Sequence, residues 1–201
     1  MRQLIQPNGA ELDTHIAMLQ RMVNKGLADG ESRKLAVKIV SGKFDTARDP
    51  RGQIHSVVTA YGGAFTAPPG PTCRMQDDRC EIEKIWDFMA LNVRYVYDTT
   101  TMDVFCTLRE TLIAGGADCD DQTIAFATLL GSIGFTVIAR VITLKSAPDD
   151  WAHVYPLVGL SKGVDKKWMA LDQSVKGTMP GWEYPNRAKH KDYVLVSSTS
   201  G

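Results

Sequence analysis

The chain has 201 residues and carries 23 Lys and Arg residues against 23 Asp and Glu residues, so its formal net charge is zero. A chain without net charge has no general electrostatic attraction to nucleic acid or to an anionic membrane, which disfavours both as partners. With 44% hydrophobic residues, it is long enough to bury the core of one globular domain, or of one domain with an appendage.

The first residues and the cysteines suggest a compartment. The segment 1–8 lacks the apolar stretch of about 7 to 15 residues that a signal peptide needs, and no apolar run reaches about 18 residues. We therefore expect a cytoplasmic protein, in which Cys73, Cys80, Cys106 and Cys119 need no disulfide framework. Cys73 and Cys80 have no second ligand pair and no nearby histidine, so we expect neither zinc nor another cofactor.

The N-terminal third predicts two helices followed by a loop. Apolar residues at helical spacing indicate a helix over about 12–23 that ends near 26–30, and a shorter one over 35–40. Nine glycines and prolines then fall within 41–72, which predicts a long irregular connection and a candidate lid over Cys119. We thus expect a helical lead-in with this connection over 1–72, and a catalytic core with a C-terminal tail over 73–201.

The remaining chain alternates helical and strand patterns. A helical face over 81–93 leads into the β-like segment 94–97, and a second buried helix begins near Cys119 and ends before Gly134. Residues 135–144 and the runs beginning at Trp151 and Lys167 read as strands, with a further edge strand over 193–196 in an otherwise frayed tail. The pattern predicts an α+β fold in which the helix that begins at Cys119 packs on an antiparallel sheet.

Cys119, His153 and Asp172 are the groups that thiol acyl transfer requires. Cys119 lies at a helix N-terminus, where free amides favour a thiolate, and Asp118 is placed to cap that helix, with Asp121 able to complete a capping-box-like pair. Because these carboxylates oppose a thiolate, a cationic histidine is needed. A symmetric connection over 159–166 would place His153 directly opposite Asp172 on neighbouring strands.

The segments GGADCDDQT, GFTVIARV, WAHVYPLV and WMALDQS, in this order, resemble the transglutaminase-like family. The resemblance covers about 81–175 and implies a papain-like core with Cys119 as nucleophile, His153 as general base and acid, and Asp172 as the group that orients the imidazole. Two positions depart from the family pattern. Ala117 stands where glycine is usual, which would strain a positive φ, and Gln173 stands where proline is common.

The expected reaction is acyl transfer on a peptide or carboxamide bond through a thioester. Water as acceptor would make the chain a cysteine protease or amidase, and an amine would make it a transglutaminase. The Cys119 N–H is the first oxyanion donor, and the sequence identifies no second. We expect a protein or peptide substrate and no nucleic acid or membrane partner.

Other interpretations remain open at this point. Cys119 could be a small core residue, His153 a hydrogen-bonded core histidine and Asp172 a turn former. The chain would then be a non-catalytic structural or interaction protein on the same fold, for example one associated with a phage. An acyltransferase that uses a thioester cofactor is a third alternative, but no glycine-rich phosphate-binding signature supports it.

Overall fold

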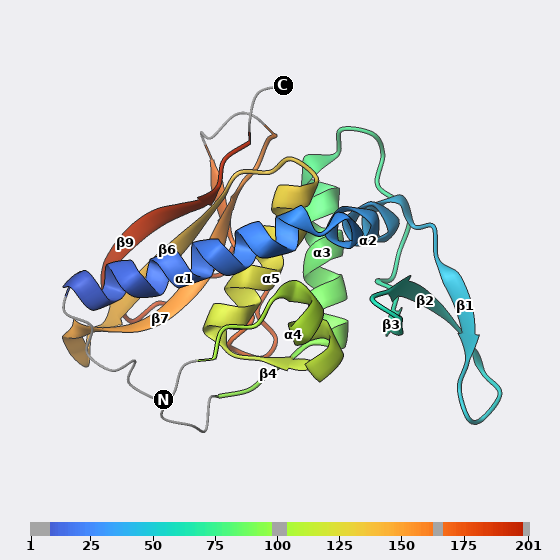
Figure 1. The fold of residues 1–201 in the computed structure, drawn as a ribbon, viewed down its shortest axis with the longest axis horizontal. Helices are drawn as coiled ribbons and strands as arrows, with labels where there is room; N and C mark the ends of the chain where they lie inside the picture. The colour runs from blue at the N-terminus through green and yellow to red at the C-terminus, as the bar shows by residue number, and fades with distance from the viewer. Residues whose placement is uncertain (1–8, 98–103, 163–166, 199–201) are drawn as a thin grey trace.

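The computed structural model describes residues 9–97, 104–162 and 167–198, which form a mixed fold of helices and three sheets. Figure 1 shows the largest sheet at one end, the helices in the middle and a smaller sheet that projects at the other end. The helices are α1 (Gly9–Ala28), α2 (Gly30–Ser41), α3 (Asp78–Asn92), α4 (Leu108–Ala114) and α5 (Cys119–Ser132). The α+β class expected from the sequence is confirmed.

The largest sheet is antiparallel and has the strand order β8, β7, β6, β9. Its strands are β6 (Val137–Leu144), β7 (Ala147–Gly159), β8 (Trp168–Ala170) and β9 (Arg187–Val196). Helix α5 packs against β6 and β7, as the sequence predicted, and α1 lies across α5 and reaches β9. The tail was expected to fray outside 193–196, which was wrong, because β9 pairs with β6 from Arg187 to Val196.

The N-terminal helices join the same hydrophobic core as α5. Leu12, Ile16, Leu19 and Val23 of α1 are all buried, which confirms the predicted helical face. They belong to one cluster with the buried side chains of α3, α5 and the large sheet. The second face of that sheet carries a smaller cluster, to which Tyr155 and Leu157 belong. No helix among the described residues is long and apolar enough to cross a bilayer.

The segment 41–72 is not an irregular connection. It contains an antiparallel sheet of β1 (Asp45–Arg48), β2 (Ile54–Ala60) and β3 (Gly63–Thr66), in that order. Glycine and proline were read as breakers of regular structure, but several of the glycines form its tight turns, such as Gly62, which has a φ of 80°. Asn92 at the end of α3 hydrogen-bonds both the N–H and the C=O of Thr66, which ties β3 to the helices.

Cys73 and Cys80 form a disulfide between the segment after β3 and the first turn of α3. The expectation that this chain has no disulfide was therefore wrong. It was based on chain length and expected compartment, and neither reports the separation of two cysteines in space. The bridge closes a short loop between the small sheet and the helices.

A two-stranded parallel sheet leads directly into α5. In it β4 (Arg94–Tyr95) pairs with β5 (Gly116–Ala117), so that Tyr95 lies opposite Ala117. The positive φ before the cysteine falls at Gly115, where α4 ends, and Ala117 has no positive φ. The departure at Ala117 therefore causes no backbone strain.

Candidate active site

Cys119 is the first residue of α5, and it is half-buried. Asp118 caps the helix as predicted, because its carboxylate accepts hydrogen bonds from the Asp120 and Asp121 amides at 3.0 Å each. The Asp121 carboxylate accepts from the N–H of Cys106 at 2.6 Å, which ties the start of α4 to the first turn of α5. The short pairing of β4 with β5 fixes the approach of the chain, so the thiol has a defined position.

The thiol lies beside a stretch of β7 that β8 leaves unpaired. The ladder between these strands ends at Leu157 and Ala170, and a last hydrogen bond joins the Leu171 N–H to the Pro156 C=O at 2.9 Å. Beyond this point the Val154 N–H is directed at the Cys119 sulfur. The early end of β8 thus provides the place where the N-terminus of α5 meets the sheet edge.

His153 and Asp172 are in direct contact, as the sequence predicted. The imidazole Nε2 lies 2.9 Å from Oδ2 of Asp172, and both residues are buried. Direct opposition across the strands was wrong, because the observed register places Leu157 opposite Ala170, two residues away from the symmetric one. A shift of two residues keeps each side chain on its face of the sheet, and diagonal neighbours are within reach of one another.

The hydrogen bond to Asp172 determines which imidazole nitrogen is available. An ionised carboxylate only accepts hydrogen bonds, so Nε2 carries the proton and Nδ1 is left as the acceptor. Burial alone would raise the pKa of Asp172. The hydrogen bond from His153, the positive charge that this imidazole carries when it is protonated, and the bonds from Ser174 outweigh burial and lower that pKa. Asp172 is thus held ionised, as a group that orients an imidazole must be.

The thiol does not have the environment expected from its helix position. Burial raises the pKa of Cys119 well above its ordinary value, the charges of Asp120 and Asp118 raise it further, and the Val154 N–H opposes them. The free amides at the start of the helix favour a thiolate, but desolvation and the carboxylates of the same turn oppose it more strongly. Among the described contacts there is no hydrogen bond between the thiol and the imidazole, so Cys119 rests as a thiol that needs a base.

Tyr95 is a site residue that the sequence analysis missed. It lies on β4 opposite Ala117, which is two residues before Cys119, and its ring meets that of Tyr97 edge-on, with the ring centroids 5.2 Å apart. Burial raises the pKa of the Tyr95 phenol, and the nearby charges of Cys119 and Asp118 raise it further. The hydroxyl thus stays protonated, is close enough to feel the charge of Cys119, and can donate a hydrogen bond. The only signal in the sequence was its place on the strand-like run before the cysteine motif.

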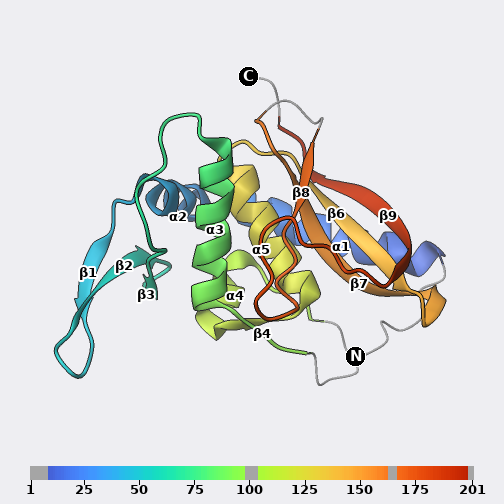
Figure 2. The ribbon, with the colours of Figure 1, turned by 180° about the vertical axis from the view of Figure 1, so that it is seen from behind.

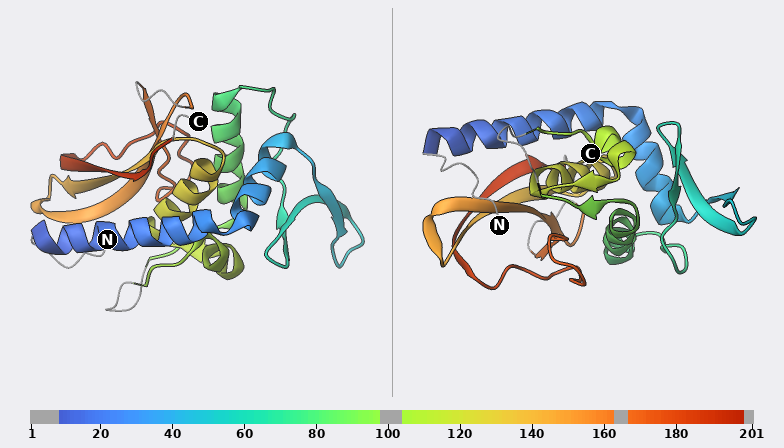
Figure 3. Two further views of the ribbon diagram at one scale, coloured as in Figure 1. Left: turned by 45° about the horizontal axis from the view of Figure 1, so that its top comes forward. Right: turned by 90° about the horizontal axis from the view of Figure 1, so that it is seen from below.

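Aromatic residues line the His153 imidazole on the face of the four-stranded sheet that carries the smaller hydrophobic cluster. Tyr155 lies two residues after His153 on β7, and the ring centroids are 5.7 Å apart, with Tyr184 at 6.4 Å. Figures 2 and 3 show that the connection between β8 and β9, which carries Asp172 and Tyr184, crosses the molecule on the side opposite α1. Glu183 fastens this connection, because its carboxylate accepts from Tyr155 and Arg140 at 2.9 Å each.

A second imidazole reaches the start of α5 from α1. Nε2 of His15 lies 2.8 Å from Oδ1 of Asp120, the residue directly after Cys119. The sequence named no partner for His15, because the two residues are far apart in the chain. Each of the two histidines, His15 and His153, thus contacts an aspartate whose charge acts on the Cys119 thiol.

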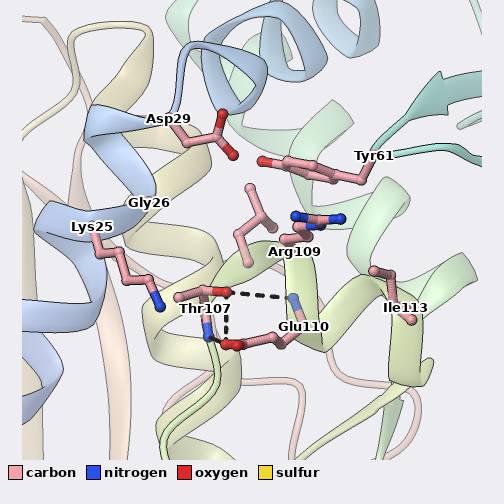
Figure 4. A pocket seen from close by; sticks show the side chains of 9 residues that line it. Lys25, Gly26, Asp29, Tyr61, Thr107, Arg109, Glu110 and Ile113 are labelled. Atoms are coloured by element: carbon pink, nitrogen blue, oxygen red, sulfur yellow. Dashed lines mark hydrogen bonds between the residues drawn. The ribbon is translucent and has the colours of Figure 1, made fainter.

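A pocket of about 360 Å³ lies elsewhere, between the end of α1, the β2–β3 turn and α4. Figure 4 shows Tyr61 and Arg109 on one side of it and Lys25 on the other. Its two carboxylates have structural roles, since Asp29 caps α2 and Glu110 completes the capping box of α4. Cys119, His153 and Asp172 do not line this pocket, so it is separate from the candidate active site.

In the part of the chain that the structure describes, no cluster of three or more His, Cys, Asp or Glu residues is arranged to hold a metal ion. Comparison with protein-family models finds no match, and a search of curated proteins finds none either. The assignment of chemistry to this site therefore depends on its own geometry.

Proposed function

We propose that this chain is an enzyme of cysteine-dependent acyl transfer, with Cys119 as nucleophile, His153 as base and acid, and Asp172 as the orienting group. The observation that carries the proposal is the buried hydrogen bond of 2.9 Å between His153 and Asp172. His153 lies on β7, and the N–H of the next residue, Val154, faces the Cys119 sulfur. In His153, Nε2 is held by a carboxylate, Nδ1 is left as a base, and the next residue of the strand contacts a thiol. A structural protein has no need for such an arrangement. The resemblance to transglutaminase-like proteins, with their papain-like core, supports the same assignment.

The raised pKa of Cys119 determines how the reaction begins. A pre-formed thiolate is not favoured here, so the proton leaves the sulfur for Nδ1 of His153 as the sulfur attacks the substrate carbonyl carbon. The C–N bond then breaks, the leaving amine takes the proton from His153, and the acyl group stays on Cys119 as a thioester. Water or a second amine attacks this thioester and gives its proton to His153, which returns it to the thiol.

The tetrahedral intermediates carry a negative oxygen that needs donors. The Cys119 N–H at the start of α5 is the first donor, because α5 leaves its first amides without helical partners. The Tyr95 hydroxyl is the second candidate, since Tyr95 pairs with Ala117 near the start of α5, is close enough to feel the charge of Cys119, and stays protonated. The proposed substrate is a protein or peptide that offers a peptide or carboxamide bond. We propose a cytoplasmic location and neither a membrane nor a nucleic acid as partner.

The proposal is tested by trapping the acyl group. The full chain is incubated with a p-nitrophenyl ester, and the modified cysteine is located by peptide mass spectrometry. We expect rapid acylation of Cys119, release of the acyl group by hydroxylamine, and a large loss of rate in His153→Ala. Cys106 is the internal control, since burial first and the Asp121 carboxylate next raise its pKa to about 12. Equal slow labelling of Cys106 and Cys119, unaffected by His153→Ala, would reject the proposal in favour of a non-catalytic protein.

A further inference from the structure

The contact between His15 and Asp120 is partly buried and joins two elements far apart in the sequence. The side chain of Asp120 is 5% exposed and that of His15 is 14% exposed, with 2.8 Å between Nε2 and Oδ1. Phe105 packs edge-on against the imidazole, with the ring centroids 4.9 Å apart. A carboxylate this deeply buried is costly unless a donor or a cation neutralises it, and α1 supplies that group by packing across α5.

Asp120 is also the carboxylate with the strongest influence on the nucleophile. Burial is the largest cause of the raised pKa of the Cys119 thiol, and the charge of Asp120 is the second largest. The charged and titratable groups around the thiol come from four elements or connections. They are Asp118 at the N-cap of α5 and Asp120 in its first turn, Asp172 after β8, Tyr95 on β4 and His153 on β7.

The two imidazoles have different tasks in this arrangement. His153 offers Nδ1 to the reacting atoms, while His15 uses Nε2 on a carboxylate that opposes ionisation of the sulfur. We propose that His15 is a positioning residue of the thiol site, which acts through Asp120 by holding and neutralising this carboxylate so that the Cys119 thiolate can form. The inference depends on the proposed role of Cys119 as nucleophile, and it makes α1 a working part of the site.

The test measures ionisation of the thiol without any substrate. In the full chain, the rate of Cys119 alkylation by iodoacetamide is followed by mass spectrometry against pH for the parent, His15→Ala, His15→Gln and Asp120→Asn. We expect His15→Ala to slow alkylation about tenfold at mildly alkaline pH and to move the whole curve to higher pH by about one unit. Asp120→Asn should move the curve the other way. His15→Gln keeps a hydrogen-bond donor and should recover part of the loss.

The double variant separates action through Asp120 from a general effect on packing. If His15 acts through this carboxylate, His15→Ala should change little once Asp120→Asn is present. The matched control is His55→Gln, which removes another histidine that faces an aspartate, Asp49, on the small sheet. We expect this control to leave the curve of the parent unchanged.

Three results would overturn the inference. They are an unshifted curve in a folded His15→Ala, an equal shift by His15→Ala with and without Asp120→Asn, or an equal shift in His55→Gln. If His15→Ala does not fold, as judged by circular dichroism, His15→Gln and Asp120→Asn decide in the same way. Failure of the proposed function has a different signature, because the alkylation curves would respond to His15 while the ester fails to acylate Cys119.

Discussion

The two antiparallel sheets differ in how much of their surface is buried. The four-stranded sheet lies between two hydrophobic clusters, and seven of the eight residues of β6 are buried. In the three-stranded sheet, by contrast, β1 and β3 have no buried residue, and β2 has three in its second half. The candidate active site lies at the edge of the first sheet, where β8 ends early and β7 offers an unpaired amide next to an imidazole.

This difference in burial bears on the chemistry proposed for the site. The buried sheet holds His153 in place, and the end of one short strand lets the Asp172 connection and the start of α5 approach the same point. The small sheet offers exposed strands and turns, and its aspartate–histidine contact, between Asp49 and His55, lies at 3.4 Å on the surface. We therefore expect changes in the large sheet to alter reactivity, and changes in the small sheet to alter stability alone.

The largest effect is expected for Asp172→Asn. The amide can donate to Nε2 and thereby favour the wrong tautomer, so we expect the rate of Cys119 acylation to fall about 10²- to 10⁴-fold while the fold persists. The measurement is ester acylation, with circular dichroism as the check on folding. Asp49→Asn on the small sheet is the matched control and should leave the rate unchanged. Equal losses in the two variants would contradict the special role of the large sheet.

Asp172→Asn should also change how the stability of the fold depends on pH in the acid range. The pKa of Asp172 is lowered in the folded protein, so its ionisation stabilises the fold above the ordinary carboxyl pKa near 3.8, and this contribution is lost as the pH falls through the folded value. The stability gap between the parent and Asp172→Asn, measured by urea unfolding, should be widest near neutral pH and shrink below about pH 4. A constant gap would show that the ionised carboxylate is not what stabilises this site.

A smaller effect, of about 10²-fold on acylation, is expected for Tyr95→Phe. The change removes a hydroxyl beside the thiol and leaves the ring in its contact with Tyr97. Alkylation by iodoacetamide forms no oxyanion, so its rate should stay within about threefold of the parent. Tyr97→Phe is the control, because that side chain is 61% exposed. Equal loss of both reactions in Tyr95→Phe would show that the hydroxyl affects the thiol and not the oxyanion.

The parts of the fold with a strong periodic pattern could be predicted from the sequence. The apolar face of α1 and the run of Val, Ile and Thr in β6 fix a helix and a buried strand without reference to the rest of the chain. The exposed sheet over 45–66 was missed because its strands alternate weakly and its glycines resemble loop residues. Only the three-dimensional pairing of the chain shows that those glycines form hairpin turns.

The residues of the candidate site likewise divide into those with a local sequence signal and those without one. Cys119, His153 and Asp172 could be proposed from the sequence because each lies in a short recognisable segment. The strand period kept His153 and Asp172 on one face despite the shifted register. His15 and Tyr95 carry no such local signal. The crossing of α1 over α5 brings His15 to the site, and the pairing of β4 with β5 brings Tyr95, and neither arrangement follows from local periodicity.

The smallest effect on reactivity is expected at the disulfide between the small sheet and α3. Replacing Cys73 and Cys80 by Ser frees a short loop in the unfolded chain, and we expect unfolding to become easier by about 2 to 3 kcal/mol in urea. Alkylation of Cys119 should keep the rate of the parent, because Cys73 and Cys80 are not among the contacts of the thiol site. In the parent, unfolded without reductant, only Cys106 and Cys119 should react. A loss of Cys119 reactivity in this variant would mean that the small sheet helps to position the active site, and the division between the two sheets would then fail.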